Sequence, residues 1–127
     1  MALGPEGKVK EAVKRLLKDK GIFYYMPVQN GMGQVGIPDF ICCWRGRFLA
    51  IETKAPGKRA NTSANQERVI EAIWSADGWA IVVDDVEQVK DFFTEIESDK
   101  QYSEARFAAA DCPGNDDSQT PARNASL

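Results

Sequence analysis

The chain has 127 residues, of which 43% are hydrophobic and 28% are charged, as expected for one globular domain. It contains no histidine, which excludes a Ser-His-Asp or Cys-His catalytic arrangement and any zinc site with histidine ligands. Its three cysteines lack the spacing of a metal clip or a disulfide framework, which indicates a reducing compartment. No apolar run approaches the roughly 20 residues that span a bilayer, and we see no signal peptide, so we expect a cytoplasmic protein without a membrane partner.

The formal net charge of −3 conceals two halves of opposite sign. Residues 1–70 contain twelve Lys and Arg against six Asp and Glu, whereas residues 71–127 contain four against thirteen. The first half therefore has a net charge of +6 and the second half −9. A polyanion would bind the basic half, although a solvated lysine-rich helix face explains the same charges equally well.

The first predicted element is an amphipathic helix from about residue 6 to Gly21, with apolar residues at helical spacing and lysines on the other side. The aromatic segment 22–28 predicts a strand, and the glycine-rich segment 29–36 predicts a loop. Two strands at 38–44 and 47–53 follow, around a two-residue turn at Arg45-Gly46.

A basic loop at 55–62 leads to a helix at 63–77, a buried strand at 79–83 and a last helix at 86–96. The order of elements predicts an α/β fold. From about residue 98 the chain is polar and shows no period. We therefore predict one domain over residues 1–98 and a disordered tail over residues 99–127.

Two carboxylates lie opposite each other in the predicted hairpin. If Arg45-Gly46 is the turn, Asp39 pairs with Glu52, and their mutual repulsion calls for a cation between them. Mg²⁺ or Mn²⁺ fits this need, because hard cations take oxygen ligands. Lys54 shares the strand face of Glu52 and places a second cation there. The alternative is a solvent-facing polar edge, which the apolar neighbours of Glu52 disfavour.

Two further residues have ambiguous roles. On a helical wheel Glu6 lies in the sector of Val9 and Val13, so we expect it to face inward and Glu11 to face water. An acidic residue in a first helical turn is also favoured by the helix dipole alone. Gln66 lies three residues after Ser63, which matches a capping box and would explain the glutamine without a catalytic role.

These residues carry a resemblance to a known family. The segment Gly36-Ile37-Pro38-Asp39, followed after twelve residues by Glu52-Thr53-Lys54, resembles the PD-(D/E)XK nuclease signature. The wider pattern over residues 5–90 resembles the stand-alone VRR-Nuc domains that are common in phages. This resemblance implies a restriction-endonuclease-like αβββαβ core, with a mixed central sheet flanked by helices.

The resemblance also implies an activity, namely metal-dependent hydrolysis of DNA phosphodiesters with Mg²⁺ or Mn²⁺ as the cofactor. It implies that Asp39 and Glu52 bind the metal, with Glu6 as a further acidic ligand. Lys54 would position or activate water, and Gln66 would assist from its helix. The carbonyl of Thr53 is another possible ligand, because hard metals accept backbone oxygens.

DNA would approach the basic side of the molecule. Candidate contacts are the hairpin and loop cations and the polar residues of the glycine-rich loop: Arg45, Arg47, Lys58, Arg59, Gln29, Asn30 and Gln34. These side chains suit phosphate contacts, which position DNA without reading its sequence. We therefore expect a structure-selective endonuclease acting on branched DNA, such as a Holliday junction or a flap.

The family implies a homodimer and, if the gene is phage-borne, a location in the host cytoplasm. Two alternatives to this function remain open. One is a sequence-specific restriction-type nuclease, for which the chain has little room. The other is a non-catalytic DNA-binding module on the same fold, which the intact Asp39, Glu52 and Lys54 disfavour.

Overall fold

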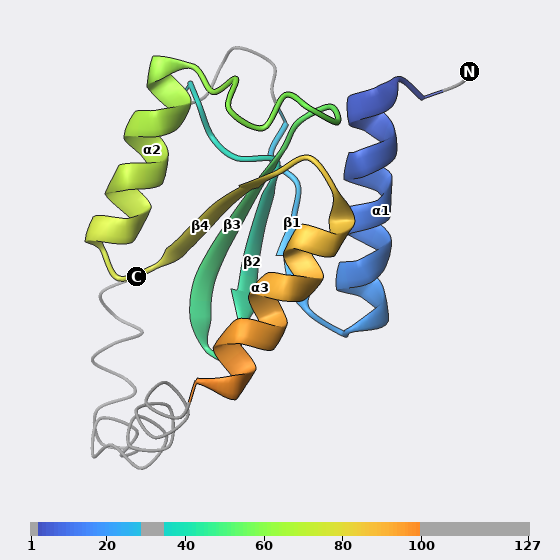
Figure 1. The fold of residues 1–127 in the computed structure, drawn as a ribbon. Coiled ribbons are helices and arrows are strands. Elements are labelled where there is room, and N and C mark those ends of the chain that lie inside the picture. The colour runs from blue at the N-terminus through green and yellow to red at the C-terminus, as the bar shows by residue number, and fades with distance from the viewer. Residues whose placement is uncertain (1–2, 29–34, 100–127) are drawn as a thin grey trace, which may run out of the picture. The chain divides into compact units, whose positions relative to one another are not determined.

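The structure is a computed structural model that describes residues 3–28 and 35–99. The described residues divide into two units, with the boundary between Val89 and Lys90. Within the described ranges the elements follow the predicted order (Figure 1): α1 (Pro5–Asp19), β1 (Phe23–Tyr25), β2 (Phe40–Trp44), β3 (Arg47–Thr53), α2 (Ala64–Ser75), β4 (Trp79–Val83) and α3 (Val86–Ser98). The predicted α/β class is confirmed.

The four strands form one mixed sheet in the order β1-β2-β3-β4. The first three strands are antiparallel neighbours, and β4 runs parallel to β3 because α2 crosses over between them. The register predicted for the hairpin is confirmed, since Phe40 pairs with Ile51 and Trp44 with Arg47. Arg45 and Gly46 have φ angles of 53° and 77°, and two positive values are what a tight two-residue turn requires.

Strand residues alternate between two faces of the sheet. Phe40, Cys42 and Leu49 are buried on one face, and α1 buries its own apolar stripe of Val9, Val13 and Leu17. On the other face Ile41 and Phe48, together with Val69 and Ile73 of α2, line an apolar pocket of about 460 Å³. No residue of α2 is buried, so this helix leaves part of its sheet face accessible.

Two strands are shorter than predicted. The strand expected at 22–28 covers only Phe23–Tyr25, and the strand expected from residue 38 begins at Phe40. Pro27 and Pro38 explain both limits, because proline has no N–H to donate to the neighbouring strand.

Nearly all of the predicted tail lies outside the described residues, so the boundary at residue 98 stays a prediction. None of the helices within 3–28 and 35–99 combines the length and the apolar character that crossing a bilayer requires.

Candidate active site

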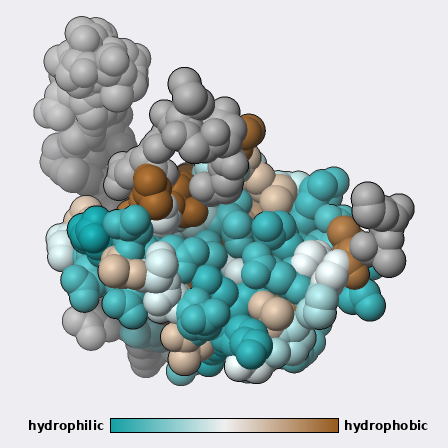
Figure 2. Space-filling view, turned by 90° about the horizontal axis from the view of Figure 1, so that it is seen from above, coloured by the Kyte–Doolittle hydropathy of each residue, from teal (hydrophilic) through white to brown (hydrophobic). Residues whose placement is uncertain are grey.

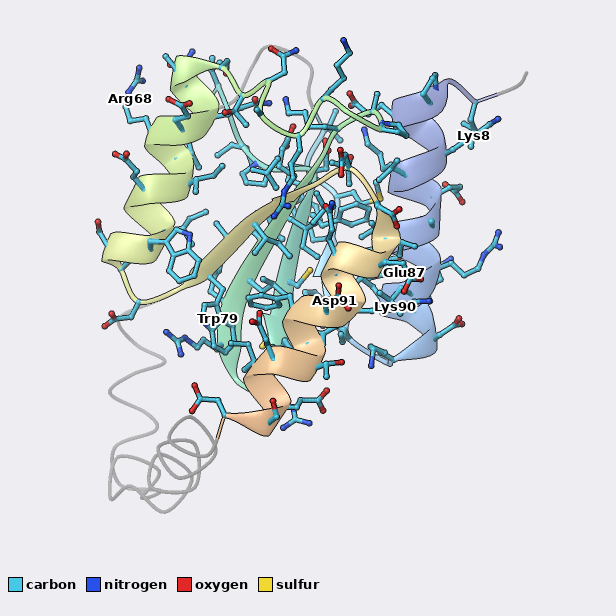
Figure 3. All side chains as sticks on the ribbon, in the orientation of Figure 1. Lys8, Arg68, Trp79, Glu87, Lys90 and Asp91 are labelled. Carbon is cyan, nitrogen blue, oxygen red and sulfur yellow. The ribbon has the colours of Figure 1, made fainter. Side chains whose placement is uncertain are left out.

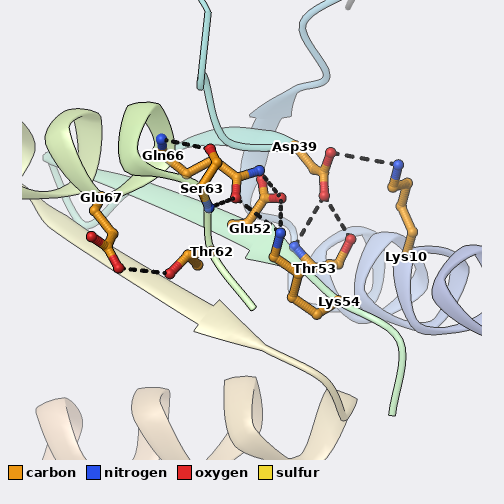
Figure 4. A network of polar contacts seen from close by, with 9 residues as sticks. All are labelled: Lys10, Asp39, Glu52, Thr53, Lys54, Thr62, Ser63, Gln66 and Glu67. Atoms are coloured by element: carbon orange, nitrogen blue, oxygen red, sulfur yellow. Dashed lines mark hydrogen bonds and ion pairs between the residues drawn. The ribbon is translucent and has the colours of Figure 1, made fainter. Parts of the chain in front are cut away.

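Polar side chains gather at the end of the sheet where β3 and β4 finish. Figure 1 shows that α1 and α2 both begin at this end. Asp39 directly precedes β2, Glu52 and Thr53 complete β3, and Lys54 follows that strand. Figure 4 shows two groups of polar contacts at this end, one around Asp39 and the other around Glu52 and Lys54.

Asp39 is held by the end of β3 and by α1. Its Oδ2 accepts hydrogen bonds from the backbone N–H of Thr53 at 3.0 Å and from the Thr53 hydroxyl at 2.6 Å. Its Oδ1 lies 3.5 Å from the ammonium of Lys10. Thr53 is fully buried, so the orientation of the Asp39 carboxylate is set by a rigid part of the sheet.

Glu52 is the most buried carboxylate of the site, with 5% of its surface exposed. Its Oε2 accepts a hydrogen bond from the amide nitrogen of Gln66 at 2.9 Å and lies 3.6 Å from the ammonium of Lys54. Burial, and after it the negative charge of Asp39, raise the pKa of Glu52 to about 7. The two carboxylates are therefore close enough to interact electrostatically, as the hairpin register predicted.

Gln66 connects the start of α2 to Glu52 at the end of β3 and to Lys54 just after it. Ser63 and Gln66 form the predicted capping box: the Ser63 side chain accepts from the Gln66 N–H, and the Gln66 side chain accepts from the Ser63 N–H. The same amide oxygen accepts a hydrogen bond from Lys54 at 2.9 Å. A capping role and a role at the site are therefore compatible for Gln66, because the same side chain caps α2 and contacts Glu52 and Lys54.

Gly36 allows α2 to approach the segment that leads to Asp39. Its φ is 86°, and a Cβ at this position would lie 2.7 Å from both the carbonyl carbon and the oxygen of Asn65. Any larger residue would separate the Asp39 segment from the N-terminus of α2.

The prediction that Glu6 faces inward is wrong. Glu6 lies on the same side of α1 as Val13 and Leu17, but it is in the first helical turn, where its side chain is exposed. Glu11 is exposed, as expected. The α1 side chain that contacts the site is Lys10, one turn after Glu6. Lys10 was not among the predicted site residues, although its four-residue spacing from Glu6 places the two side chains on neighbouring turns of one helix face.

The donor atoms of the site suit a divalent cation, although the described residues contain no group of three or more Asp, Glu or Cys that could hold a metal ion. Asp39 and Glu52 supply carboxylate oxygens, which hard cations prefer. The contacts of Glu52 with Gln66 and Lys54 involve Oε2, and Thr53 binds Oδ2 of Asp39. Additional oxygen donors would have to come from Glu6, the Thr53 carbonyl, water or substrate.

The predicted DNA-binding residues divide into two groups. Lys58 and Arg59 are exposed in the loop after β3, and the Arg59 side chain donates to the Val82 carbonyl at 2.9 Å. This end of the molecule has a largely hydrophilic surface (Figure 2). Arg45 and Arg47 lie at the opposite end of β3, about 17 Å from Glu52 for five strand residues. Of the four described candidates, Lys58 and Arg59 lie in the loop that begins where β3 ends, and Arg45 and Arg47 lie at the other end of that strand.

The hairpin arginines are also engaged with aromatic rings. The Arg47 guanidinium lies 4.1 Å from the ring centre of Trp79, and its Nε donates to the Asp77 carbonyl. Trp79 is labelled at the start of β4 in Figure 3. The Arg45 guanidinium lies 5.4 Å from the ring centre of Trp44. The other three predicted contacts, Gln29, Asn30 and Gln34, lie outside the described residues.

Comparisons with known proteins agree with this architecture. A solved structure described as a VRR_NUC domain matches with a TM-score of 0.58 and 24% sequence identity, over 72% of this chain and 97% of that chain. The chain has the fold of a VRR_NUC domain. No family model and no curated protein matches the sequence. The VRR_NUC fold implied by the motif resemblance is thus confirmed at the level of structure.

Proposed function

We propose that this protein is a metal-dependent, structure-selective DNA endonuclease that hydrolyses phosphodiester bonds. The observation that carries the proposal is the grouping of Asp39, Glu52, Lys54 and Gln66 at one end of the sheet. Two carboxylates beside a lysine are a chemically sufficient set for this reaction, and none of the roles requires histidine. The likeness to a VRR_NUC domain supports the same function.

The metal would be Mg²⁺ or Mn²⁺, bound by Asp39 and Glu52. Glu6 and the Thr53 carbonyl are the additional ligands that this chain offers, and Glu6 would have to turn its exposed side chain toward the site. When bound, such a cation supplies Lewis acidity and neutralises phosphate charge.

The chain's own residues would perform the remaining tasks. Lys54 would orient the attacking water, while Gln66 keeps the Lys54 ammonium and the Glu52 carboxylate in a fixed relation through its two hydrogen bonds. Thr53 would keep Asp39 oriented through two hydrogen bonds of its own. This pre-organisation lowers the cost of reaching the reactive geometry.

DNA binding would rest on phosphate contacts from Lys58 and Arg59, which are exposed in the loop after β3. Such contacts carry no sequence information, which favours selection of branched DNA by its shape. Arg45 and Arg47 would contact a more distant part of a large substrate. The glycine-rich loop, with Gln29, Asn30 and Gln34, completes the proposed DNA surface.

We expect the active form to be a cytoplasmic homodimer, since two strands of a branched substrate require two sites. Exposed apolar side chains support an association surface, among them Phe23 with 70% and Tyr25 with 56% of their surface exposed. Light scattering after size exclusion tests this expectation, and a monomer at micromolar concentration would contradict it.

The function is tested with single-stranded, duplex, flap, nicked and four-way DNA, each incubated with Mg²⁺, Mn²⁺ or a chelator. We expect cleavage of flap or four-way DNA only when metal is present. The variants Asp39→Ala, Glu52→Ala and Lys54→Ala should lose it by at least about 100-fold, the usual scale for a group that acts in the transition state. Undiminished metal-dependent cutting by folded Glu52→Ala protein would refute the proposal.

A further inference from the structure

Lys10 is a charged residue of α1 that contacts the carboxylate of Asp39. Its side chain keeps 33% of its surface exposed, and its ammonium lies 3.5 Å from Oδ1 of Asp39, whose side chain is 13% exposed. Figure 4 shows Lys10 on the side of Asp39 away from Glu52 and Gln66.

The two oxygens of Asp39 have different partners. Oδ2 accepts both hydrogen bonds from Thr53, at 3.0 and 2.6 Å, and these donors belong to the rigid sheet. Oδ1 is therefore the oxygen of this carboxylate that a cation would contact. The ammonium of Lys10 is next to that oxygen, so a metal ion and Lys10 compete for it.

The charges of the site indicate what Lys10 does when a metal binds. Two ammonium groups, Lys10 and Lys54, face the two carboxylates and balance their ionised charge. A divalent cation adds two positive charges and repels both lysines. Lys54 is 12% exposed and is held by Gln66 at 2.9 Å, whereas Lys10 is more exposed. Lys10 is thus the lysine that can move away at lower cost.

We propose that Lys10 neutralises Asp39 in the metal-free protein and becomes a DNA phosphate ligand when a metal occupies the site. The inference rests on the proposed nuclease function and adds a substrate-binding residue to it. The metal-loaded site, with two lysines and a divalent cation against two carboxylates, carries an excess of about two positive charges. A phosphodiester beside it supplies the matching negative charge.

The test measures two binding affinities of the full chain, neither of which depends on turnover. Mn²⁺ affinity without DNA is measured by calorimetry, and four-way DNA affinity is measured by fluorescence anisotropy with Ca²⁺ present. Replacing Lys10 with methionine should tighten Mn²⁺ binding about fivefold, because a competitor for Oδ1 is lost. The same variant should weaken DNA binding about fivefold and reduce its salt slope by about one.

Lys8→Met is the matched control. It removes the same charge two residues earlier, from a side chain that Figure 3 shows directed away from the sheet. Lys10→Arg keeps the charge and should preserve both affinities within about twofold, a change of less than 0.5 kcal/mol. Circular dichroism confirms that each variant is folded, and Lys10→Gln replaces Lys10→Met if the latter is not.

The outcomes separate this inference from the function on which it rests. If Lys10→Met binds Mn²⁺ more tightly but binds DNA as well as Lys8→Met does, the Lys10–Asp39 ion pair is purely structural and the proposal is overturned. Unchanged metal affinity would overturn it as well. If the wild-type protein binds both ligands but does not cleave DNA, the nuclease function fails while the competition at Asp39 still stands.

Discussion

At the scale of single residues, the site depends on the partners that hold each carboxylate. Asp39 is held by Thr53 and Lys10, and Glu52 by Gln66 and Lys54. Because both acids are largely removed from water, a change in one partner alters their charge or their orientation. The two predictions at this scale concern the charge of Glu52 and the orientation of Asp39.

Glu52 should make the metal-free protein less stable as the pH rises. Its pKa is about 7 in the folded chain against an ordinary value of 4.5, so the folded state keeps the proton longer than the unfolded state does. Its contribution to stability is fully present below pH 4.5 and is lost as the pH rises through 7. In chelator at pH 8, Glu52→Gln should therefore be more stable than wild type by about 2–3 kcal/mol.

Urea unfolding between pH 5 and 8 measures this effect. The control is Glu71→Gln, which removes an exposed carboxylate from α2 and should follow the wild-type pH dependence. A Glu52→Gln curve that runs parallel to wild type over the whole range would contradict the prediction.

Thr53 should set the orientation of Asp39. Thr53→Val has nearly the same shape but lacks the hydroxyl that donates to Asp39 Oδ2 at 2.6 Å. We expect a loss of about 1–3 kcal/mol in unfolding free energy and a higher metal concentration for half-maximal cleavage. Thr53→Ser keeps the hydroxyl and should need no more metal than wild type. Equal metal requirements in the two variants would show that the hydroxyl does not matter.

At the scale of elements, the site exists because α2 begins against the segment before β2. The capping box fixes the first turn of α2 and at the same time presents Gln66 to Glu52 and Lys54. Gly36 permits this contact, since no side chain fits between it and the backbone of Asn65. The capping box and the close approach at Gly36 therefore both help to place Gln66 against Glu52 and Lys54.

Gly36→Ala should be more harmful than a comparable glycine replacement elsewhere. Gly57 is the matched control, because its φ of 83° is close to the 86° of Gly36 but a Cβ there meets nothing within 4 Å. Both variants pay about 1–2 kcal/mol for the left-handed conformation. Gly36→Ala should lose about 2 kcal/mol more, because its Cβ meets backbone atoms, and should also cleave DNA more slowly. Equal melting temperatures would contradict this.

At the scale of the whole molecule, positive and negative charges are segregated along the chain. Residues 1–70 carry a net charge of +6, and they include the exposed loop cations Lys58 and Arg59. The acidic second half makes the total negative and would hide a DNA-binding function from any argument based on net charge alone.

The loop cations should dominate the salt dependence of DNA binding. The double variant Lys58→Ala/Arg59→Ala should reduce the slope of log affinity against log salt by about one to two units. Lys14→Ala/Lys18→Ala removes the same charge from α1 and should change the slope less. Anisotropy titrations at several salt concentrations measure both, and an unchanged slope for the loop variant would move the DNA to another surface.

Much of the fold could be predicted from local rules. Alternation along the strands, together with a two-residue turn, specified the register that pairs Phe40 with Ile51 and so brings Asp39 near Glu52. The capping box was visible as Ser63 and Gln66 at the right spacing. The ends of β1 and β2 were less predictable. Pro27 and Pro38 lack the N–H that a strand donates to its neighbour, and a pattern of apolar residues alone does not show this.

The order of elements, the α/β class and the carboxylate pair follow from periodicity and a short turn, so they could be predicted locally. Three contacts could not: Lys10 rather than Glu6 contacts Asp39, Gln66 both caps α2 and bridges Glu52 to Lys54, and Gly36 lies against Asn65. They depend on where the end of each helix lies relative to the edge of the sheet. A helical wheel gives the direction of a side chain around the axis but not its position along the sheet.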